Sequence, residues 1–328
     1  MRMPYFVQRA KGNSLRTPWK RVLRLTKIIV IVFIILSVSG CKAEKETEII
    51  DRSGRTVVIK NPINRIISTA PSNTEIIADI GQADRLVAID VHSVNVAGIP
   101  ANLPLLDFFY PDAETIINLK PDLIIASGHN PTGTGEDPFK LLREAGIAVV
   151  YISMSKSVEE IYMDIEFVAD LLDAEKEGEQ LIAFTRAQVA QTADYISQKT
   201  AHYEKRSSVY FELSAPPYMM AFGKDSFIDD MITIIGARNI FGNEDWLVMP
   251  GAESLIERNP DVILTSVNYI DDPAGEIKER PGFNHISAVI NNRVYQIDND
   301  SSSRPSARII LALRQMAQAV YPELYEQH

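Results

Sequence analysis

Two segments of this chain, 139 positions apart, have the same order of polar and apolar residues. Residues 111–127 and 250–266 both contain a proline, a glutamate three positions later, a short amphipathic stretch, a Pro-Asp pair and an apolar run. The glutamates are Glu114 and Glu253. Each segment predicts a short helix, a turn and a buried strand. A unit that occurs twice in one chain predicts two similar lobes.

The same alternation of apolar runs and amphipathic stretches continues from Arg65 to the end of the chain. Strands are expected near 66–67, 86–89, 123–126, 147–152, 208–213, 262–264 and 293–297, and helices near 72–81, 112–119, 138–145, 226–235, 251–258 and 306–320. Strands that alternate with helices through short links predict mainly parallel sheets covered by helices on both faces. Two local signals are more specific. A turn at Ser53 and Gly54 predicts a hairpin over 51–60, and residues 72–75 read as a capping box at a helix start.

Residues 157–203 have a different pattern, without proline and with apolar positions at helical spacing. This pattern predicts one long helix that connects the two lobes rigidly. The alternative is an ordinary pair of helices, with the break at Gly178, the single glycine of the segment.

The chain before residue 50 is predicted to serve export. The first 40 residues contain eight positive and no negative charges, and the apolar run 28–36 is too short to span a bilayer. This composition is typical of a secretory signal, and an uncleaved anchor helix is the alternative. The predicted division is a signal at 1–40, a tether at 41–49, an N-terminal lobe at 50–154, a connecting region at 155–205 and a C-terminal lobe at 206–328.

Residues 38–41 (Val-Ser-Gly-Cys) resemble the lipobox of bacterial lipoproteins, which implies cleavage before Cys41 and lipidation of its thiol. Cys41 is the only cysteine, so an internal disulfide is excluded. The expected location is the outer face of the cell membrane or the periplasm. Loss of the eight positive charges takes the net charge from −10 to −18, which argues against nucleic acid as a partner.

Several features together resemble the periplasmic binding proteins that serve ABC importers of iron-siderophores and cobalamin. They are the lipobox, residues 65–75, the repeated Pro-x-x-Glu unit, the long connector and residues 304–312. The resemblance covers about residues 50–325. It implies an α/β fold of two similar lobes with mainly parallel sheets, joined by one long α-helix, with the ligand cleft between the lobes.

The resemblance also implies partners. A permease dimer with its ATPase subunits is expected to receive the ligand, and Glu114 and Glu253 are expected to dock on permease arginines through bidentate pairs. In the alternative reading these two carboxylates favour only the dipoles of their own helices.

Ligands of open α/β sheets bind beyond the carboxyl ends of the strands, and the loops expected there are rich in large rings. The resemblance places His92, Phe108, Trp246 or Leu247, and Asp300 at cleft-lining positions, with Arg304 close by. The predicted ligand-binding residues are His92, Phe108, Phe109, Tyr110, His129, Tyr218, Trp246, Asp300 and Arg304. The alternative is local packing for the rings and a solvated loop position for the histidines.

The expected ligand is a bulky metal chelate rather than a resident cofactor. A ferric siderophore is the first expectation, a cobalamin or other corrinoid the second and haem the third. Siderophore binders often present several cations, whereas the loops here offer mainly Arg304, with Lys224 as a second. The five histidines are scattered, so a direct metal site, which needs three or four converging ligands, is not expected.

The sequence gives little support to two other functional classes. The chain contains no G-x-S-x-G elbow, phosphate loop or G-x-G-x-x-G motif, so an enzyme is not expected. A surface adhesin or sensor would keep a cleft but would not require paired docking glutamates.

Overall fold

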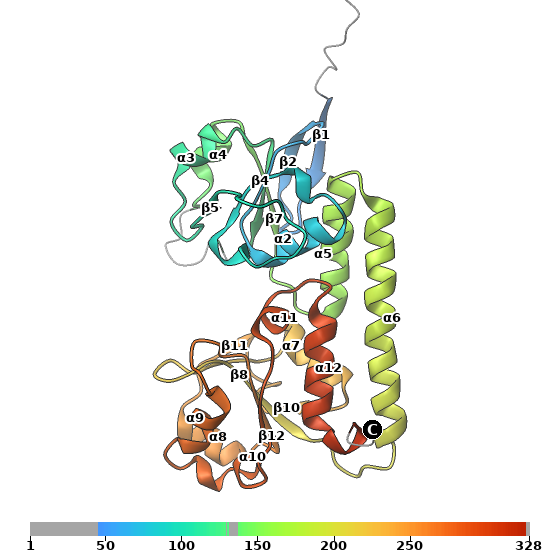
Figure 1. Cartoon of the computed structure of the whole chain (residues 1–328), viewed down its shortest axis with the longest axis vertical. Coiled ribbons are helices and arrows are strands. Elements are labelled where there is room, and N and C mark those ends of the chain that lie inside the picture. The colour runs from blue at the N-terminus through green and yellow to red at the C-terminus, as the bar shows by residue number, and fades with distance from the viewer. Residues whose placement is uncertain (1–44, 129, 131–136, 326–328) are drawn as a thin grey trace, which may run out of the picture. The chain divides into compact units, whose positions relative to one another are not determined.

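The structure, a computed structural model, describes residues 45–128, 130 and 137–325. Its described residues from Glu46 onward form one compact unit, in which two α/β lobes lie beside a pair of helices (Figure 1). The predicted signal, Cys41 and His129 lie outside the described residues. Among the helices of the described part, none is both long enough and apolar enough to cross a membrane.

The N-terminal lobe contains a five-stranded sheet in the order β5-β4-β3-β6-β7, and every neighbouring pair in it is parallel. Its strands are β3 (Ile66–Ser68), β4 (Leu86–Asp90), β5 (Leu105–Leu106), β6 (Leu123–Ser127) and β7 (Ala148–Ile152). Its helices are α2 (Pro71–Asp79), α3 (Ala113–Asn118) and α4 (Lys140–Glu144). All five residues of β6 are buried, as expected for a central strand covered on both faces.

The C-terminal lobe contains a mixed sheet in the order β11-β9-β8-β12-β13, with β10 also paired to β8. Four strands of this sheet are parallel to one another: β8 (Ser208–Ser214), β10 (Arg238–Asn239), β12 (Val262–Thr265) and β13 (Val294–Gln296). Two further strands are antiparallel to their neighbours: β9 (Met220–Phe222) and β11 (Leu247–Val248). Its helices are α7 (Phe227–Ile234), α8 (Ala252–Arg258), α9 (Pro273–Glu279), α10 (Ser287–Ile290), α11 (Asn299–Ser303) and α12 (Ile309–Val320). The prediction of two lobes with mainly parallel sheets is confirmed.

The repeated sequence unit forms the same structure in each lobe. Helix α3 leads to β6 in the first lobe, and α8 leads to β12 in the second. Lys120 and Asn259, each just before the proline that precedes the strand, both have positive φ values, of 48° and 45°. Each unit therefore has a residue with a left-handed backbone at the same position, between its helix and the proline.

The connecting region contains two helices, α5 (Val158–Leu171) and α6 (Glu175–Thr200). The long connector is present as α6, whose 26 residues run alongside both lobes (Figure 1). The region is nonetheless a helix pair, and its break lies at 172–174, where Asp173 has a φ of 53°. The alternative of a helix pair placed this break at Gly178, and that position is wrong. Gly178 lies inside α6, where a Cβ would come within 2.4 Å of the Cβ of Ala169, so this glycine permits close packing of α5 against α6.

The N-terminal hairpin is present, but it begins earlier than expected. Strand β1 (Lys45–Ile50) pairs with β2 (Thr56–Asn61), and Gly54 takes a φ of 82° in the turn. Residues 45–49 are therefore a strand rather than part of the tether. The physical reason is a weak alternation, because Thr47 and Ile49 are half-buried while Glu48 between them is exposed.

The capping box expected at residues 72–75 is absent. Helix α2 begins after Ala70, which makes no side-chain cap. Glu75 is only 2% exposed, and its carboxylate accepts hydrogen bonds from Arg304 and Ser306 in the other lobe. The local pattern predicts that Glu75 caps the start of the helix, but its carboxylate instead binds residues of the other lobe.

Candidate functional site

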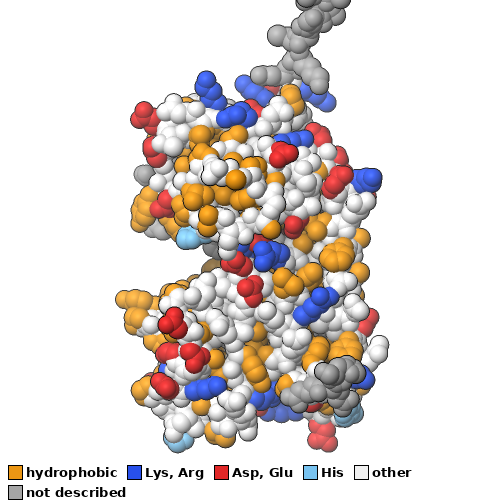
Figure 2. Space-filling model, viewed as in Figure 1, with side chains coloured by type: hydrophobic (Ala, Val, Ile, Leu, Met, Phe, Trp, Pro, Cys, Tyr) orange, Lys and Arg blue, Asp and Glu red, His pale blue; other side chains and the backbone are white. Residues whose placement is uncertain are grey.

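A cleft with a volume of about 550 Å³ lies between the two lobes. Figure 2 shows the surface hollowed between the upper and lower halves of the molecule, on the left of the view. Residues that follow β3, β4 and β6 line one wall, and residues after β12 together with α11 line the other. These are carboxyl ends of parallel strands, where the ligand site of an open α/β sheet is expected.

Neutral amides are prominent in the lining of this cleft. Asn95, Asn130, Asn268 and Asn299 all contribute to it. The Asn130 Oδ1 accepts hydrogen bonds from the Thr69 hydroxyl at 2.6 Å and from the Ser127 amide at 2.7 Å. The Asn299 Nδ2 donates to the Ser266 carbonyl at 2.7 Å. Because these contacts use only part of the Asn130 and Asn299 amides, hydrogen-bonding capacity is left there for a ligand.

Arg304 is the only Arg or Lys in the described part of the cleft lining, and its charge is paired. Its Nη1 lies 2.9 Å from Glu75 Oε1 and its Nη2 lies 2.7 Å from Asp300 Oδ1. The Arg304 side chain is only 9% exposed. The guanidinium therefore joins the lobes by an ion pair rather than standing free in the cleft.

The cleft wall also contains a buried carboxyl group, Asp90, at the end of β4. Burial raises the pKa of Asp90, and a hydrogen bond from the His92 amide to Asp90 Oδ1, at 2.8 Å, partly opposes that effect. With Asp90 and Asp300 against one paired arginine, the lining presents no surplus of positive charge.

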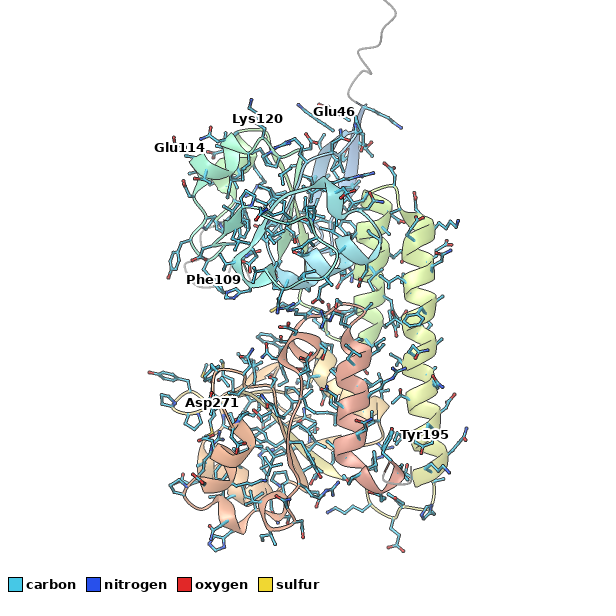
Figure 3. The ribbon with its side chains drawn as sticks, in the orientation of Figure 1. Glu46, Phe109, Glu114, Lys120, Tyr195 and Asp271 are labelled. Carbon is cyan, nitrogen blue, oxygen red and sulfur yellow. The ribbon has the colours of Figure 1, made fainter. Side chains whose placement is uncertain are left out.

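Five of the sequence-predicted ligand residues line this cleft: His92, Phe108, Phe109, Asp300 and Arg304. Phe109 is 65% exposed and lies at the edge of the N-terminal lobe (Figure 3). Phe108 is 1% exposed and packs on Phe139, with ring centroids 6.1 Å apart. Contact of each residue with a ligand stays a prediction.

Other predicted residues lie outside the lining. Tyr110 and Tyr218 are exposed, at 85% and 76%. Trp246 is half-buried and packs edge-on against Phe222. Its ring therefore contacts the apolar core of its own lobe rather than lining the cleft. Lys224 lies 3.6 Å from Asp245, its ion-pair partner. Leu247, the alternative to Trp246, is half-buried in β11.

The sequence-based prediction missed the asparagines and Glu75. Asn95, Asn268 and Asn299 follow β4, β12 and β13, so their positions after strands were an available signal. No local signal pointed to Glu75, since its partner Arg304 is 229 positions away.

The two predicted docking glutamates occupy equivalent places. Glu114 and Glu253 are exposed in the first turns of α3 and α8. Helices α3 and α8 lie on the side of the described unit that is opposite α6 (Figure 1), and Figure 3 labels Glu114 on that side. The Glu114 amide donates to Asp112 Oδ1 at 3.1 Å, which fixes the start of α3. Both carboxylates are therefore available to a partner.

No group of three or more His, Cys, Asp or Glu side chains within the described ranges could hold a metal ion.

Comparisons with known proteins agree with this architecture. The family model described as Periplasmic binding protein matches residues 66–301. An uncharacterized ABC transporter substrate-binding lipoprotein of Bacillus subtilis (strain 168) is 29% identical over 291 residues, which cover 87% of this chain and 90% of the relative. A Vitamin B12-binding protein of Vibrio campbellii is 27% identical over 259 residues, with 78% and 89% covered. The crystal structure of a possible iron-binding (periplasmic solute-binding) protein of Staphylococcus epidermidis is 31% identical, with a TM-score of 0.68 and with 79% of this chain and 99% of that chain covered. This chain belongs to the periplasmic binding protein family and is a substrate-binding protein of the ABC transporter type.

Proposed function

We propose that this protein captures a bulky metal chelate without net negative charge, a corrinoid in the first place, and delivers it to an ABC permease dimer with its ATPase subunits. The observation that carries the proposal is the cleft between the lobes, which is lined by four asparagines and by an arginine whose charge is already paired. The rim of a corrin ring carries carboxamide groups, and asparagine amides can both donate to and accept from such groups.

The charge of the cleft favours a corrinoid over an anionic ferric siderophore as the ligand. A ferric tricatecholate carries three negative charges, and a charge removed from water requires a compensating partner. The cleft offers Arg304, but Glu75 and Asp300 already compensate its charge. We therefore propose a corrinoid as the first candidate ligand, whereas the sequence analysis favoured a ferric siderophore.

A neutral ferric trihydroxamate is the second candidate. It satisfies the same charge argument, and the similar Staphylococcus epidermidis protein is described as a possible iron-binding protein. Haem comes third. Exposed His92 lies in the lining and could approach an iron atom, but the two haem propionates would meet the same lack of free positive charge.

The export and docking steps are part of the proposal. Lipidation of Cys41 would hold the protein at the outer face of the membrane. Glu114 and Glu253 would then dock on two arginines of the permease dimer, since an arginine binds a carboxylate through two parallel hydrogen bonds. The protein itself would catalyse no reaction.

Ligand titration tests the proposed function. Purified protein is titrated with cyanocobalamin, a neutral ferric trihydroxamate, a ferric tricatecholate and haem, and binding is measured by calorimetry. We expect saturable binding of cyanocobalamin and weaker or no binding of the tricatecholate.

A pair of asparagine variants tests the role of the amides in the cleft. Asn268→Ala should weaken cyanocobalamin binding roughly fivefold to tenfold, the size of one lost hydrogen bond. Asn291→Ala lies outside the cleft and should not weaken it. Failure of every uncharged chelate to bind would refute the proposal.

A further inference from the structure

A connected set of charged side chains joins the two lobes at the cleft, and we call it the interlobe charge network. It consists of Glu75 from α2 of the N-terminal lobe and of Asp300, Arg304 and Arg308 from the C-terminal lobe. Glu75 Oε1 lies 2.9 Å from Arg304 Nη1 and 3.7 Å from Arg308 Nη1. The Ser306 hydroxyl donates to Glu75 Oε2 at 2.6 Å.

The charges of this network balance. It contains two carboxylates and two guanidinium groups, so it carries no net charge when all four are ionised. Glu75 is 2% exposed and the Arg304 side chain 9%. At such burial a charge without a partner acts over a longer distance than it would in water. The removal of one carboxylate would therefore leave the network with a net positive charge, which would act electrostatically on a ligand in the cleft.

Arg304 is the member of the network that transmits such a change to the ligand. It lines the cleft, whereas Glu75 does not. The Arg304 Nη2 donates to the His92 carbonyl at 3.3 Å and to Asn95 Oδ1 at 3.2 Å, two residues of the opposite lobe that also line the cleft. The guanidinium thus sits in the cleft wall, and Glu75 lies behind it.

We propose that Glu75 determines the charge class of the ligand, because it neutralises Arg304 and thereby excludes anionic chelates from the cleft. Glu75 acts through Arg304 and touches no ligand, so it is a positioning and specificity-determining residue. The inference rests on the proposed capture of a metal chelate.

The test is the variant Glu75→Gln, which keeps the shape of the side chain and removes its charge. Binding of ferric tricatecholate, neutral ferric trihydroxamate and cyanocobalamin is measured for the wild-type and variant proteins. We expect the affinity for the trianionic tricatecholate to rise at least about tenfold, from the attraction of one uncompensated charge at reduced dielectric. The affinities for the two uncharged chelates should change less than about threefold, since they gain no such attraction.

Three controls separate charge from structure. The double variant Glu75→Gln/Arg304→Gln removes both charges and should lose the gain in tricatecholate affinity. Ser306→Ala removes a hydrogen bond to Glu75 but no charge and should produce no gain. Glu276→Gln changes the net charge by the same amount at the Arg280 pair, away from the cleft, and should also produce no gain.

The outcomes distinguish the inference from the proposed function. Equal changes in affinity for charged and uncharged chelates, or a gain that persists in the double variant, would show that Glu75 is only structural. If Glu75→Gln does not fold, Asp300→Asn removes the other carboxylate from Arg304, and a lack of gain there overturns the inference. If wild-type protein binds no chelate, the proposed function itself fails, whereas normal wild-type binding with an unaltered charge preference refutes only the inference.

Discussion

At the scale of single residues, two buried arginines have different tasks. Arg304 joins the lobes at the cleft, whereas Arg280 lies inside the C-terminal lobe, with Glu212 Oε2 at 2.5 Å and Glu276 Oε2 at 2.6 Å. Burial alone lowers the pKa of Arg280, but the hydrogen bonds to Glu212 and Glu276 outweigh it and raise the pKa. Glu212 is fully buried, and Arg280 is its ion-pair partner.

We therefore predict that Arg280→Met destabilises the protein by about 3–5 kcal/mol, because Glu212 is left buried and unpaired. Urea unfolding followed by circular dichroism measures the loss. The control is Lys140→Met, whose partner Glu144 lies 4.0 Å away on the surface, and its cost should stay below about 0.5 kcal/mol. Equal costs for both variants would contradict the prediction.

At the scale of secondary-structure elements, the packing of α5 against α6 depends on one glycine. A Cβ at Gly178 would lie 2.4 Å from the Cβ of Ala169 and would have no room. Ala169 is 1% exposed, and its methyl group is fixed to the backbone and has no rotamer that could move it aside. The close contact holds the long helix against the helix that precedes it.

Gly178→Ala is accordingly expected to destabilise the protein by about 1–3 kcal/mol through overpacking, although alanine gains about 1 kcal/mol in helix propensity. The exchange variant Ala169→Gly/Gly178→Ala returns one methyl group to the interface and should recover part of the loss. Thermal and urea unfolding of both variants provide the measurement. A single variant as stable as wild type would mean that the two helices separate at little cost.

The elements themselves were largely predictable, because their signals are local. The repeated unit, the apolar strands and the helix start at Ser226, whose hydroxyl accepts from the Asp229 amide, all follow from patterns within about ten residues. The predictions failed where a local pattern was weak or misleading. Strand β1 carries three charges in its first four residues, and the supposed cap Glu75 bonds to the opposite lobe instead.

At the scale of the whole molecule, the two lobes present equivalent exposed glutamates. Glu114 and Glu253 lie in the first turns of α3 and α8, and these helices lie on the same side of the described unit (Figure 1). Helix α6 runs alongside both lobes on the other side. Two contacts on one body reinforce each other through effective concentration, so the loss of either should weaken docking.

We predict that Glu114→Gln/Glu253→Gln lowers the stimulation of ATP hydrolysis by the reconstituted permease–ATPase complex at least about tenfold, since two charge-assisted pairs are lost. Chelate affinity should not change, because neither residue lines the cleft. Glu257→Gln, an exposed position on the same helix α8, is the matched control and should have little effect. Normal stimulation by the double variant would remove both glutamates from the docking surface.

The sequence by itself determined the order of the elements, the repeated unit with its exposed glutamates and the long connector, because hydrophobic period and turn chemistry act over a few residues. It also indicated that the cleft lies at carboxyl ends of strands, since parallel strands bring their carboxyl ends to one edge. Only the tertiary structure decided that Arg304 is neutralised by Glu75, that four asparagines meet in the lining and that Trp246 belongs to the core. These contacts depend on how one lobe is placed against the other and on which side chains fill each interior, and no local pattern encodes either.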